Sequence, residues 1–286
     1  MDVHGKQIGY VYQKNTPFAQ RALHNVSFDI QDGDFVAIVG HTGSGKSTLV
    51  KMLNGLLQPD EGTLELGTDY QLPVDPKQVS LRTLRQKVGL VFQFPEAQLF
   101  EETVLKDVMF GPKNFGLSEE EAKKQAQQAL EKVGIHEELY DRSPFELSGG
   151  QMRRVAIAGI LSLNPEVLVL DEPAAGLDPW GHQEMMELFQ TLNESGMTIL
   201  LVTHDMEDVS QYAKKVIVMD QGEKIAEMTP QQLFQDQEFL QNYHLDEPVV
   251  TQFARQLKEW GMPMPQLPIT LEEFRTILTK GGEPHE

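Results

Sequence analysis

The chain has 286 residues and a mass of 32.3 kDa, a size that suits one main domain with a smaller appendage. Its 43 acidic and 24 basic residues give a net charge of −19, which argues against a nucleic-acid binder, because such proteins need Lys and Arg to displace phosphate counterions. The absence of cysteine excludes disulfides and thiolate metal sites, and the sequence shows neither a signal-peptide run nor a stretch of roughly 20 apolar residues. We therefore expect a soluble protein that reaches a membrane only through a partner.

Two kinds of strand are predicted. Residues 7–13 and 26–30 alternate between apolar and polar side chains, as in an antiparallel sheet with one solvated face. Residues 34–40 are nearly all apolar, as in a strand that is buried on both faces. The same apolar pattern returns in three later segments, residues 166–173, 197–205 and 214–220. Because helix-length segments join these strands, we expect a parallel sheet with right-handed crossovers.

A long insert separates the first two apolar strands. It has about 125 residues, far more than one crossover needs. Much of it has a helical pattern: Ser118 and Glu121 form a capping-box signature, the periodicity continues to Val133, and Gly134 ends it. The insert is a candidate helical subdomain.

The sequence GHTGSGKST matches the phosphate-binding loop pattern G-x-x-x-x-G-K-[ST] and lies between a buried strand and a helix, the context that this pattern requires. Its glycines would let the backbone wrap a phosphate, and the helix N-terminus adds positive potential. Lys46 would hold the β- and γ-phosphates, and Ser47 would ligate Mg²⁺. The predicted nucleotide-binding residues of this loop are Gly40, His41, Thr42, Gly43, Ser44, Gly45, Lys46, Ser47 and Thr48.

Two carboxylates, Asp171 and Glu172, emerge at the C-terminal end of the second apolar strand, where ligands of open α/β sheets bind. Asp171 is expected to hold Mg²⁺ through water, and Glu172 to accept a proton from an attacking water. Acidic residues at a strand end are often only solvated, but the phosphate loop favours the catalytic interpretation.

A second glycine-rich segment, FELSGGQMRRVAIAG at 145–159, leads into an apolar helix that Asn164 and Pro165 end. Ser148, Gly149 and Gly150 at a helix N-terminus form a second candidate anion site. The helical insert separates this segment from the phosphate loop. If one chain cannot bring both onto one phosphate, two chains can: a head-to-tail pair would hold ATP between the phosphate loop of one chain and this segment of the other.

This arrangement resembles that of ATP-binding cassette (ABC) ATPases, whose signature motif matches Leu147, Ser148, Gly149, Gly150 and Gln151. The match runs from about residue 8 to 220, with the motifs in the expected order. The resemblance implies an α/β fold, an ABC-type P-loop ATPase with a RecA-like parallel-sheet core, an antiparallel β subdomain, a helical signature subdomain and a small C-terminal helical domain. It also implies ATP and Mg²⁺ as cofactors and hydrolysis of ATP to ADP and phosphate.

The ABC resemblance assigns further residues. Gln93 resembles the Q-loop glutamine, which senses Mg²⁺ and the membrane partner, and His204 resembles the switch histidine, which contacts the γ-phosphate. Asp178 resembles the D-loop aspartate, and Tyr12 the aromatic that stacks on adenine, with Tyr10 as an alternative. The implied catalytic set is Glu172, His204 and Gln93, and the implied Mg²⁺ ligands are Ser47, Gln93 and Asp171.

Residues 91–116, VFQFPEAQLFEETVLKDVMFGPKNFG, give a closer resemblance, to the ATPases of energy-coupling factor (ECF) transporters, bacterial importers of vitamins and metal ions. Those importers pair two similar ATPases beneath a transmembrane scaffold that engages interchangeable substrate-binding membrane proteins. The sequences FPEAQLFEETV and NTPFAQRAL are most similar to the second ATPase of the pair. The resemblance implies a heterodimer with a paralogous ATPase and a peripheral location on the cytoplasmic face of the cell membrane.

The segment after Gln93 is the predicted docking surface for the membrane scaffold. It places acidic side chains beside apolar ones, which suits a short helix that presents an arginine, since Arg pairs bidentately with carboxylate. Either Glu96 or Glu102 is expected to be the principal carboxylate, and a solvated acidic loop is the alternative. The predicted docking residues are Phe94, Glu96, Leu99, Phe100, Glu101 and Glu102.

The pattern changes after residue 220, so we expect an ABC ATPase domain at 1–220, with its helical subdomain at about 94–164, and a C-terminal helical extension at 221–286. The extension shows three amphipathic segments, the last with Thr270 and Glu273 as a capping box. The ECF resemblance implies that the extension helps the ATPases to dimerise, and a tail packed only on its own domain is the alternative.

Two other functions compete with the transporter. A chromosome-maintenance or DNA-repair ABC ATPase would need long heptad arms or a basic groove, and the sequence has neither. A soluble ABC-type assembly ATPase has the same core, but the docking segment and the helical tail argue against it.

Overall fold

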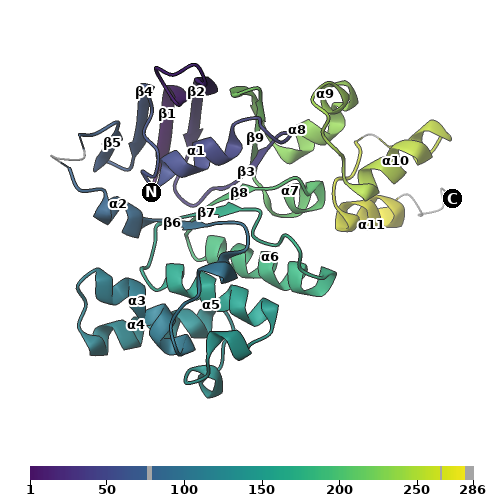
Figure 1. The fold of residues 1–286 in the computed structure, drawn as a ribbon. Helices are drawn as coiled ribbons and strands as arrows, with labels where there is room; N and C mark the ends of the chain where they lie inside the picture. Colours follow the sequence, from purple (N-terminus) through teal and green to yellow (C-terminus); the bar gives the residue numbers. More distant parts are fainter. Residues whose placement is uncertain (76–78, 265, 281–286) are drawn as a thin grey trace.

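Two β-sheets organise the fold, and helices pack around them (Figure 1). The structure is a computed structural model that describes residues 1–75, 79–264 and 266–280. The larger sheet has the strand order β10-β9-β3-β8-β7-β6, in which β10 alone runs antiparallel to its neighbour. The smaller sheet is antiparallel, with the order β2-β1-β4-β5.

The strands of the larger sheet are β3 (Phe35–Val39), β6 (Val88–Val91), β7 (Val167–Asp171), β8 (Thr198–Val202), β9 (Lys215–Asp220) and β10 (Glu223–Met228). Those of the smaller sheet are β1 (Val3–Tyr12), β2 (Gln20–Ile30), β4 (Glu61–Leu66) and β5 (Tyr70–Leu72).

The helices are α1 (Lys46–Leu53), α2 (Arg82–Lys87), α3 (Val104–Asn114), α4 (Glu119–Lys132), α5 (Gly149–Leu161), α6 (Pro179–Glu194), α7 (Met206–Tyr212), α8 (Pro230–Gln235), α9 (Gln237–Asn242), α10 (Val249–Glu259) and α11 (Leu271–Lys280). Short 3₁₀ turns are η1 (Pro95–Gln98), η2 (Glu137–Leu139) and η3 (Pro144–Glu146).

The apolar strands are buried because each face of the larger sheet is covered by helices. Along β7, Val167 and Val169 join an apolar cluster with α1 and the smaller sheet. The alternating residues Leu168 and Leu170 join a second cluster with α3, α4, α5 and α6 on the other face. The predicted parallel sheet is therefore confirmed, and α1 and α5 lie on opposite faces of it.

Two strands of the larger sheet lie outside the apolar pattern. Strand β6 has only four residues, too few to show a periodicity of its own, and it pairs in parallel with β7. Strand β10 is half-buried along most of its length and follows β9 through a turn at Gln221 and Gly222, where both residues have positive φ. The sheet therefore extends by one strand at each edge beyond the predicted four.

The insert forms the helical region at the lower part of Figure 1, where α3, α4 and α5 pack together. Ser118 caps α4 through the predicted box with Glu121, Val133 is the C-cap, and Gly134 has a φ of 73°. A second capping box, formed by Ser148 and Gln151, begins α5. The glycines of the signature segment are therefore the first turn of the helix rather than a loop before it.

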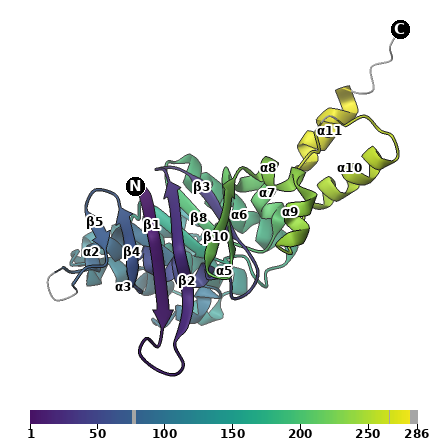
Figure 2. The same cartoon turned by 90° about the horizontal axis from the view of Figure 1, so that it is seen from above.

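The described C-terminal residues, 230–264 and 266–280, contain the four helices α8 to α11, one more than the three predicted segments. Asp236 ends α8 and caps α9 by accepting a hydrogen bond from the Phe239 N–H, so one predicted segment contains two helices. Helices α10 and α11 project from the body of the molecule (Figure 2). They share a small apolar cluster of Ala254, Met264, Leu267 and Phe274. No helix in the described part of the chain is long and apolar enough to cross a membrane.

Candidate active site

The phosphate loop joins β3 to α1 in a conformation that only glycine tolerates at two positions. Gly40 has a φ of 144°, and a Cβ there would lie 2.0 Å from the Met219 carbonyl oxygen. Gly45, the N-cap of α1, has a φ of 102°, and a Cβ there would lie 2.8 Å from the Ala22 carbonyl oxygen. The loop therefore packs closely on β9 and β2. Its other side, at the N-terminus of α1, lines an open cleft where an anion can bind.

Lys46 lies at the first turn of α1. Its Nζ donates to the carbonyl oxygens of Gly40 at 2.5 Å and His41 at 2.9 Å. Burial lowers the pKa of the Lys46 ammonium, and the nearby carboxylates of Glu172 and Asp171 oppose this effect. A bound phosphate would supply further negative charge and favour the charged ammonium.

Asp171 faces the same loop from the end of β7. Burial raises the pKa of the Asp171 carboxyl, and the charge of Glu172 adds to the increase. A hydrogen bond from Ser47 acts in the opposite direction, as do the charges of Lys46 and Lys51. Ser47 and Asp171 therefore place a hydroxyl and a partly buried carboxylate together, an all-oxygen donor set of the kind that Mg²⁺ prefers.

Glu172 contacts both of the other predicted catalytic residues, Gln93 and His204. Gln93 Nε2 donates to Glu172 Oε2 at 3.1 Å, and His204 Nδ1 lies 3.1 Å from Glu172 Oε1. The backbone of Glu172 has a φ of 49°, in the left-handed region, and its N–H donates to the Val202 carbonyl oxygen at 3.0 Å. A non-glycine residue in this conformation costs of order 1–3 kcal/mol, a strain that active sites often contain.

Asp171 and Glu172, but not Gln93 or His204, line an open cleft of about 290 Å³ over the phosphate loop. Tyr12 lines it, and its hydroxyl lies 3.3 Å from Thr48 Oγ1. Tyr10 instead packs against the apolar cluster of α1 and meets the Tyr12 ring edge to face. The geometry therefore favours Tyr12 over Tyr10 as the aromatic that contacts a base.

Residues of β2 also line the cleft, which sequence reasoning missed. These residues are Gln20, Arg21 and Ala22. Arg21 is held by a bidentate ion pair with Glu61 on β4, at 3.0 and 2.9 Å. The sequence carries no signal for this placement, because it depends on how the two sheets meet.

The signature residues lie away from this cleft. Leu147 is buried, whereas Ser148 is exposed at the N-terminus of α5. Ser148 Oγ accepts from the Gln151 N–H at 3.3 Å, and Gln151 Oε1 accepts from the Ser148 N–H at 3.0 Å. The first N–H groups of a helix have no partner within it, so Gly149 and Gly150 offer donors at an exposed helix N-terminus.

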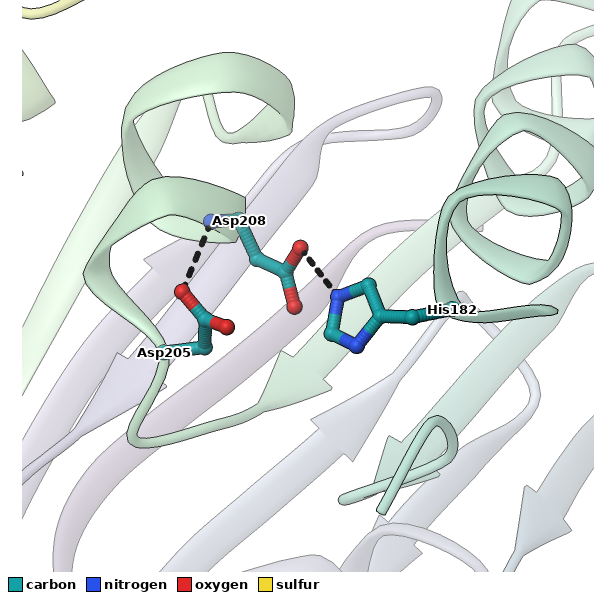
Figure 3. Close-up of side chains that lie close together, drawn as sticks. All are labelled: His182, Asp205 and Asp208. Carbon is teal, nitrogen blue, oxygen red and sulfur yellow. Dashed lines mark hydrogen bonds and ion pairs between the residues drawn. The ribbon is translucent and has the colours of Figure 1, made fainter. Parts of the chain in front are cut away.

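A polar cluster between α6 and α7 was not predicted (Figure 3). His182 Nε2 on α6 lies 2.8 Å from Asp208 Oδ1 on α7, and Asp205 accepts from the Asp208 N–H. Asp178, the predicted D-loop residue, caps the start of α6 by accepting from the N–H groups of Trp180 and Gly181. The cluster thus ties α6, which Asp178 caps, to α7, which follows His204.

The cluster predicts a pH dependence of stability. Burial raises the pKa of Asp208 to about 6, the charges of Asp205 and Glu207 add to the increase, and His182 opposes it. The protonated carboxyl is therefore favoured in the folded state, and its stabilisation is lost as the pH rises through about 6. Asp208→Asn is neutral at every pH, so its free energy of unfolding relative to the wild type should rise by roughly 1–3 kcal/mol between pH 4 and pH 7.

Urea unfolding at several pH values measures this difference. The control is Asp141→Asn, which changes an exposed aspartate and should show no such trend. A difference between Asp208→Asn and the wild type that does not change with pH would contradict the assignment of the titrating group.

The predicted docking residues do not share one exposed surface. Leu99 is buried, and Glu96 forms a bidentate ion pair with Arg153, at 3.0 and 2.8 Å. Burial is the largest single effect on the Glu96 carboxyl and raises its pKa. The hydrogen bonds and charge of Arg153, together with a backbone hydrogen bond, outweigh it, so the pKa of Glu96 lies below its usual value. The exposed members are Phe94, Phe100 and Glu102, and Glu101 is half-exposed. Glu96 is therefore engaged within the chain, and Glu102, which pairs only with exposed Lys106 on its own segment, is the more accessible of the two candidates.

Comparisons with known proteins agree with this geometry. The sequence profile of the ABC transporter family matches residues 23–175. The energy-coupling factor transporter ATP-binding protein EcfA2 of Streptococcus sanguinis (strain SK36) is 53% identical over 273 residues, which are 96% of this chain and 98% of the relative. The protein of the same name from Lactococcus lactis subsp. lactis (strain IL1403) is 52% identical over 284 residues, which are 97% of this chain and 98% of the relative.

Solved structures show the same fold. CbiO1 from Clostridium perfringens, described as part of the ABC transporter complex CbiONQ, is 36% identical, with a TM-score of 0.74 over 90% of this chain and 98% of that chain. The ATP-binding cassette MJ0796, in a dimeric post-hydrolysis state bound to ADP and Pi, is 32% identical, with a TM-score of 0.70 over 80% of this chain and 98% of that chain. The predicted ABC-type fold is confirmed. The chain belongs to the ABC transporter ATPases, and within them to the energy-coupling factor transporter ATP-binding proteins.

Proposed function

We propose that this ATPase is one of two paralogous subunits that close head to tail on ATP and power an importer of vitamins or metal ions. The observation that carries the proposal is the separation of its two anion sites. The phosphate loop leads into α1 on one face of the larger sheet, and the signature helix α5 packs on the other face. Ser148 is exposed there, so a second chain can use it. The dimeric structure of MJ0796 with ADP and Pi supports this arrangement.

Mg²⁺ fits the site because the available donors are oxygens. Ser47 and Asp171 would hold the ion. Gln93, whose Nε2 donates to Glu172, would turn its amide oxygen to the ion as a further ligand. When bound, Mg²⁺ neutralises phosphate charge and orients the phosphate groups. The rest of the chemistry belongs to the chain: Lys46 binds phosphate, and Tyr12 supplies a ring for the base.

Glu172 is the general base in this proposal. Its carboxylate is placed between Gln93 and His204, so it has one hydrogen-bonding partner on each oxygen. An attacking water must displace or join these partners to give its proton to Glu172. Gln93 directly precedes the docking segment, and His204 lies just before α7. A movement of either segment would therefore change the hydrogen bonds of the Glu172 carboxylate.

The membrane scaffold is proposed to dock beside the Q-loop. Phe100 is 56% exposed and meets Phe110 edge to face, and Phe94 is also exposed. Phe100 and Phe110 are exposed rings in contact, and Glu101 and Glu102 directly follow Phe100 in the chain, a combination that suits a helix that carries an arginine between small residues. The chain would then lie on the cytoplasmic face of the membrane, held by this contact.

The C-terminal helices α8 to α11, which follow β10, are proposed to strengthen the ATPase pair. Helices α10 and α11 have only a small core of their own, yet they expose large apolar side chains. The most exposed of these are Val249, Trp260 and Leu271. The ATPase domain would run from residue 1 to about residue 228, beyond the predicted boundary at 220, because β10 pairs with β9 in the larger sheet; its helical subdomain would lie at about 94–164.

Affinity purification tests this function. A tagged chain extracted from its cells in detergent should recover a paralogous ATPase and a polytopic membrane protein. The double variant Glu101→Lys/Glu102→Lys should lower recovery of the membrane protein by about tenfold or more, because an arginine on the partner would then meet like charge, while the paralogous ATPase remains. The matched control is Glu137→Lys/Glu138→Lys, two consecutive exposed glutamates in the same helical region.

Recovery of soluble assembly proteins in place of a membrane protein would contradict the proposal and favour the soluble assembly ATPase. Unchanged recovery of the membrane protein by the Glu101→Lys/Glu102→Lys variant would place docking elsewhere on the surface.

A further inference from the structure

Arg153 joins three segments of the site from within the protein. It lies on α5, five residues after Ser148, and is 3% exposed. Its guanidinium donates from Nε and Nη2 to the two carboxylate oxygens of Glu96, at 3.0 and 2.8 Å. Nη1 donates to the carbonyl oxygens of Pro173 and Ala175, at 3.1 and 2.8 Å.

These contacts use the planar shape of arginine. One edge of the guanidinium fits the carboxylate as a fork, and the remaining nitrogen reaches two carbonyl groups in a direction that a lysine ammonium cannot cover at the same time. The Phe94 ring also lies against the guanidinium, with Cζ 5.7 Å from the ring centroid. A buried charge is tolerated at this position because four of the five guanidinium N–H groups have acceptors, two of them the oxygens of a carboxylate.

The three segments are those that the reaction depends on. Glu96 lies in η1, three residues after Gln93, and is next to the exposed docking residues. Pro173 and Ala175 belong to the turn that directly follows the general base Glu172. Helix α5 carries Ser148 at its N-terminus. Arg153 therefore ties the docking segment and the turn after the base to the helix that presents the signature residues.

We propose that Arg153 is a positioning residue that makes η1 and α5 move as one body, so that scaffold docking on this chain sets the position of Ser148. This inference rests on the proposed function. On the head-to-tail pair, Ser148 faces the nucleotide held by the partner's phosphate loop. Docking on one chain thereby controls hydrolysis at the nucleotide bound by the other chain, and Glu96 acts as the internal link instead of the residue that meets the scaffold.

The first test compares ATPase rates of the ATPase pair with and without the membrane scaffold. Arg153→Lys should lower the stimulation by the scaffold by roughly 3–30-fold, the range seen when single residues alter coupling between sites. ATP binding should be unchanged, since Arg153 does not line the nucleotide cleft. The matched control is Arg154→Lys, at the next residue of α5, whose arginine pairs with Glu184 on α6 and not with the docking segment. It should keep the wild-type stimulation.

A second variant covers the case in which Arg153→Lys does not fold. Glu96→Gln leaves the contacts of Arg153 with Pro173 and Ala175 in place and weakens only the link to η1, because the amide has no charge and only one oxygen to accept the two hydrogen bonds from Arg153. It should lose stimulation to a similar extent, and the double variant should lose no more than either single one, because both remove the same connection. Equal stimulation of Glu96→Gln and the wild type would overturn the inference. If the scaffold does not stimulate the wild-type pair at all, the proposed function fails instead.

The direction of the coupling is tested by single-turnover hydrolysis in the assembled transporter. With Glu172→Gln in this chain, only the site on the partner's phosphate loop turns over, and adding Glu96→Gln should slow it. With the partner's general base neutralised, only the site on this chain's phosphate loop turns over, and Glu96→Gln should leave its rate within about twofold. A loss confined to this chain's own site would show that the link acts within one chain and would overturn the proposal.

Discussion

Glu172→Gln is expected to keep ATP binding and to lose roughly 10²–10⁴ of the hydrolysis rate, the usual contribution of a positioned general base. Glutamine has nearly the same shape as glutamate, and it can still accept from Gln93 and meet His204, so the site should keep its geometry. What it lacks is a carboxylate that takes the proton of the attacking water. ATP should then hold the ATPase pair closed. Steady-state phosphate release and nucleotide binding by the assembled pair measure the two effects separately.

The contrasting variant is Lys46→Ala. It removes the ammonium that would hold the β- and γ-phosphates, so it should fail mainly at nucleotide binding. Near-normal turnover by Glu172→Gln would refute its role as base. A loss of ATP binding equal to that of Lys46→Ala would show that the carboxylate serves binding rather than proton transfer.

Ser148→Arg is expected to stop hydrolysis at the partner's site while the isolated chain still binds ATP. The phosphate loop of the chain is unchanged by this substitution, and α1 lies on the other face of the sheet from α5. An arginine at the N-terminus of α5 fills the space in front of the free N–H groups of Gly149 and Gly150, which should then no longer reach a phosphate. Nucleotide binding to the isolated chain and ATP hydrolysis by the pair are the two measurements.

Ser118→Arg is the matched control, because Ser118 caps α4 in the same helical region through the same kind of box. Either substitution removes a capping serine, which costs about 1 kcal/mol of stability. Only Ser148→Arg should abolish turnover. A folded Ser148→Arg chain that cannot bind ATP on its own would show that the signature segment acts within one chain.

The fold was largely predictable because both of its strand types leave a pattern. Continuous apolar runs indicated the buried parallel strands, and the Ser118 box located α4 to the residue. Strand β6 is too short for such a pattern. The division between α8 and α9 depends on one capping contact of Asp236, which competes with a continuous amphipathic pattern across it.

The candidate site was predictable where one motif contains its own chemistry, as in the phosphate loop. Contacts between distant segments were not. Glu96 carries the same charge as Glu101 and Glu102, and nothing in the local sequence shows that only Glu96 turns inward to Arg153. The pairing of His182 with Asp208 is likewise set by the packing of α6 on α7, which no spacing along the chain encodes.

At Glu172 the residue that best fits the left-handed backbone and the residue that catalysis needs are different. Asparagine and glycine adopt a φ of 49° with less strain than glutamate does, so they would be expected to relax the turn after β7. Neither residue can take a proton from water. A library screened only for heat resistance would therefore be expected to replace Glu172, whereas one screened for turnover would retain a residue that the local backbone disfavours.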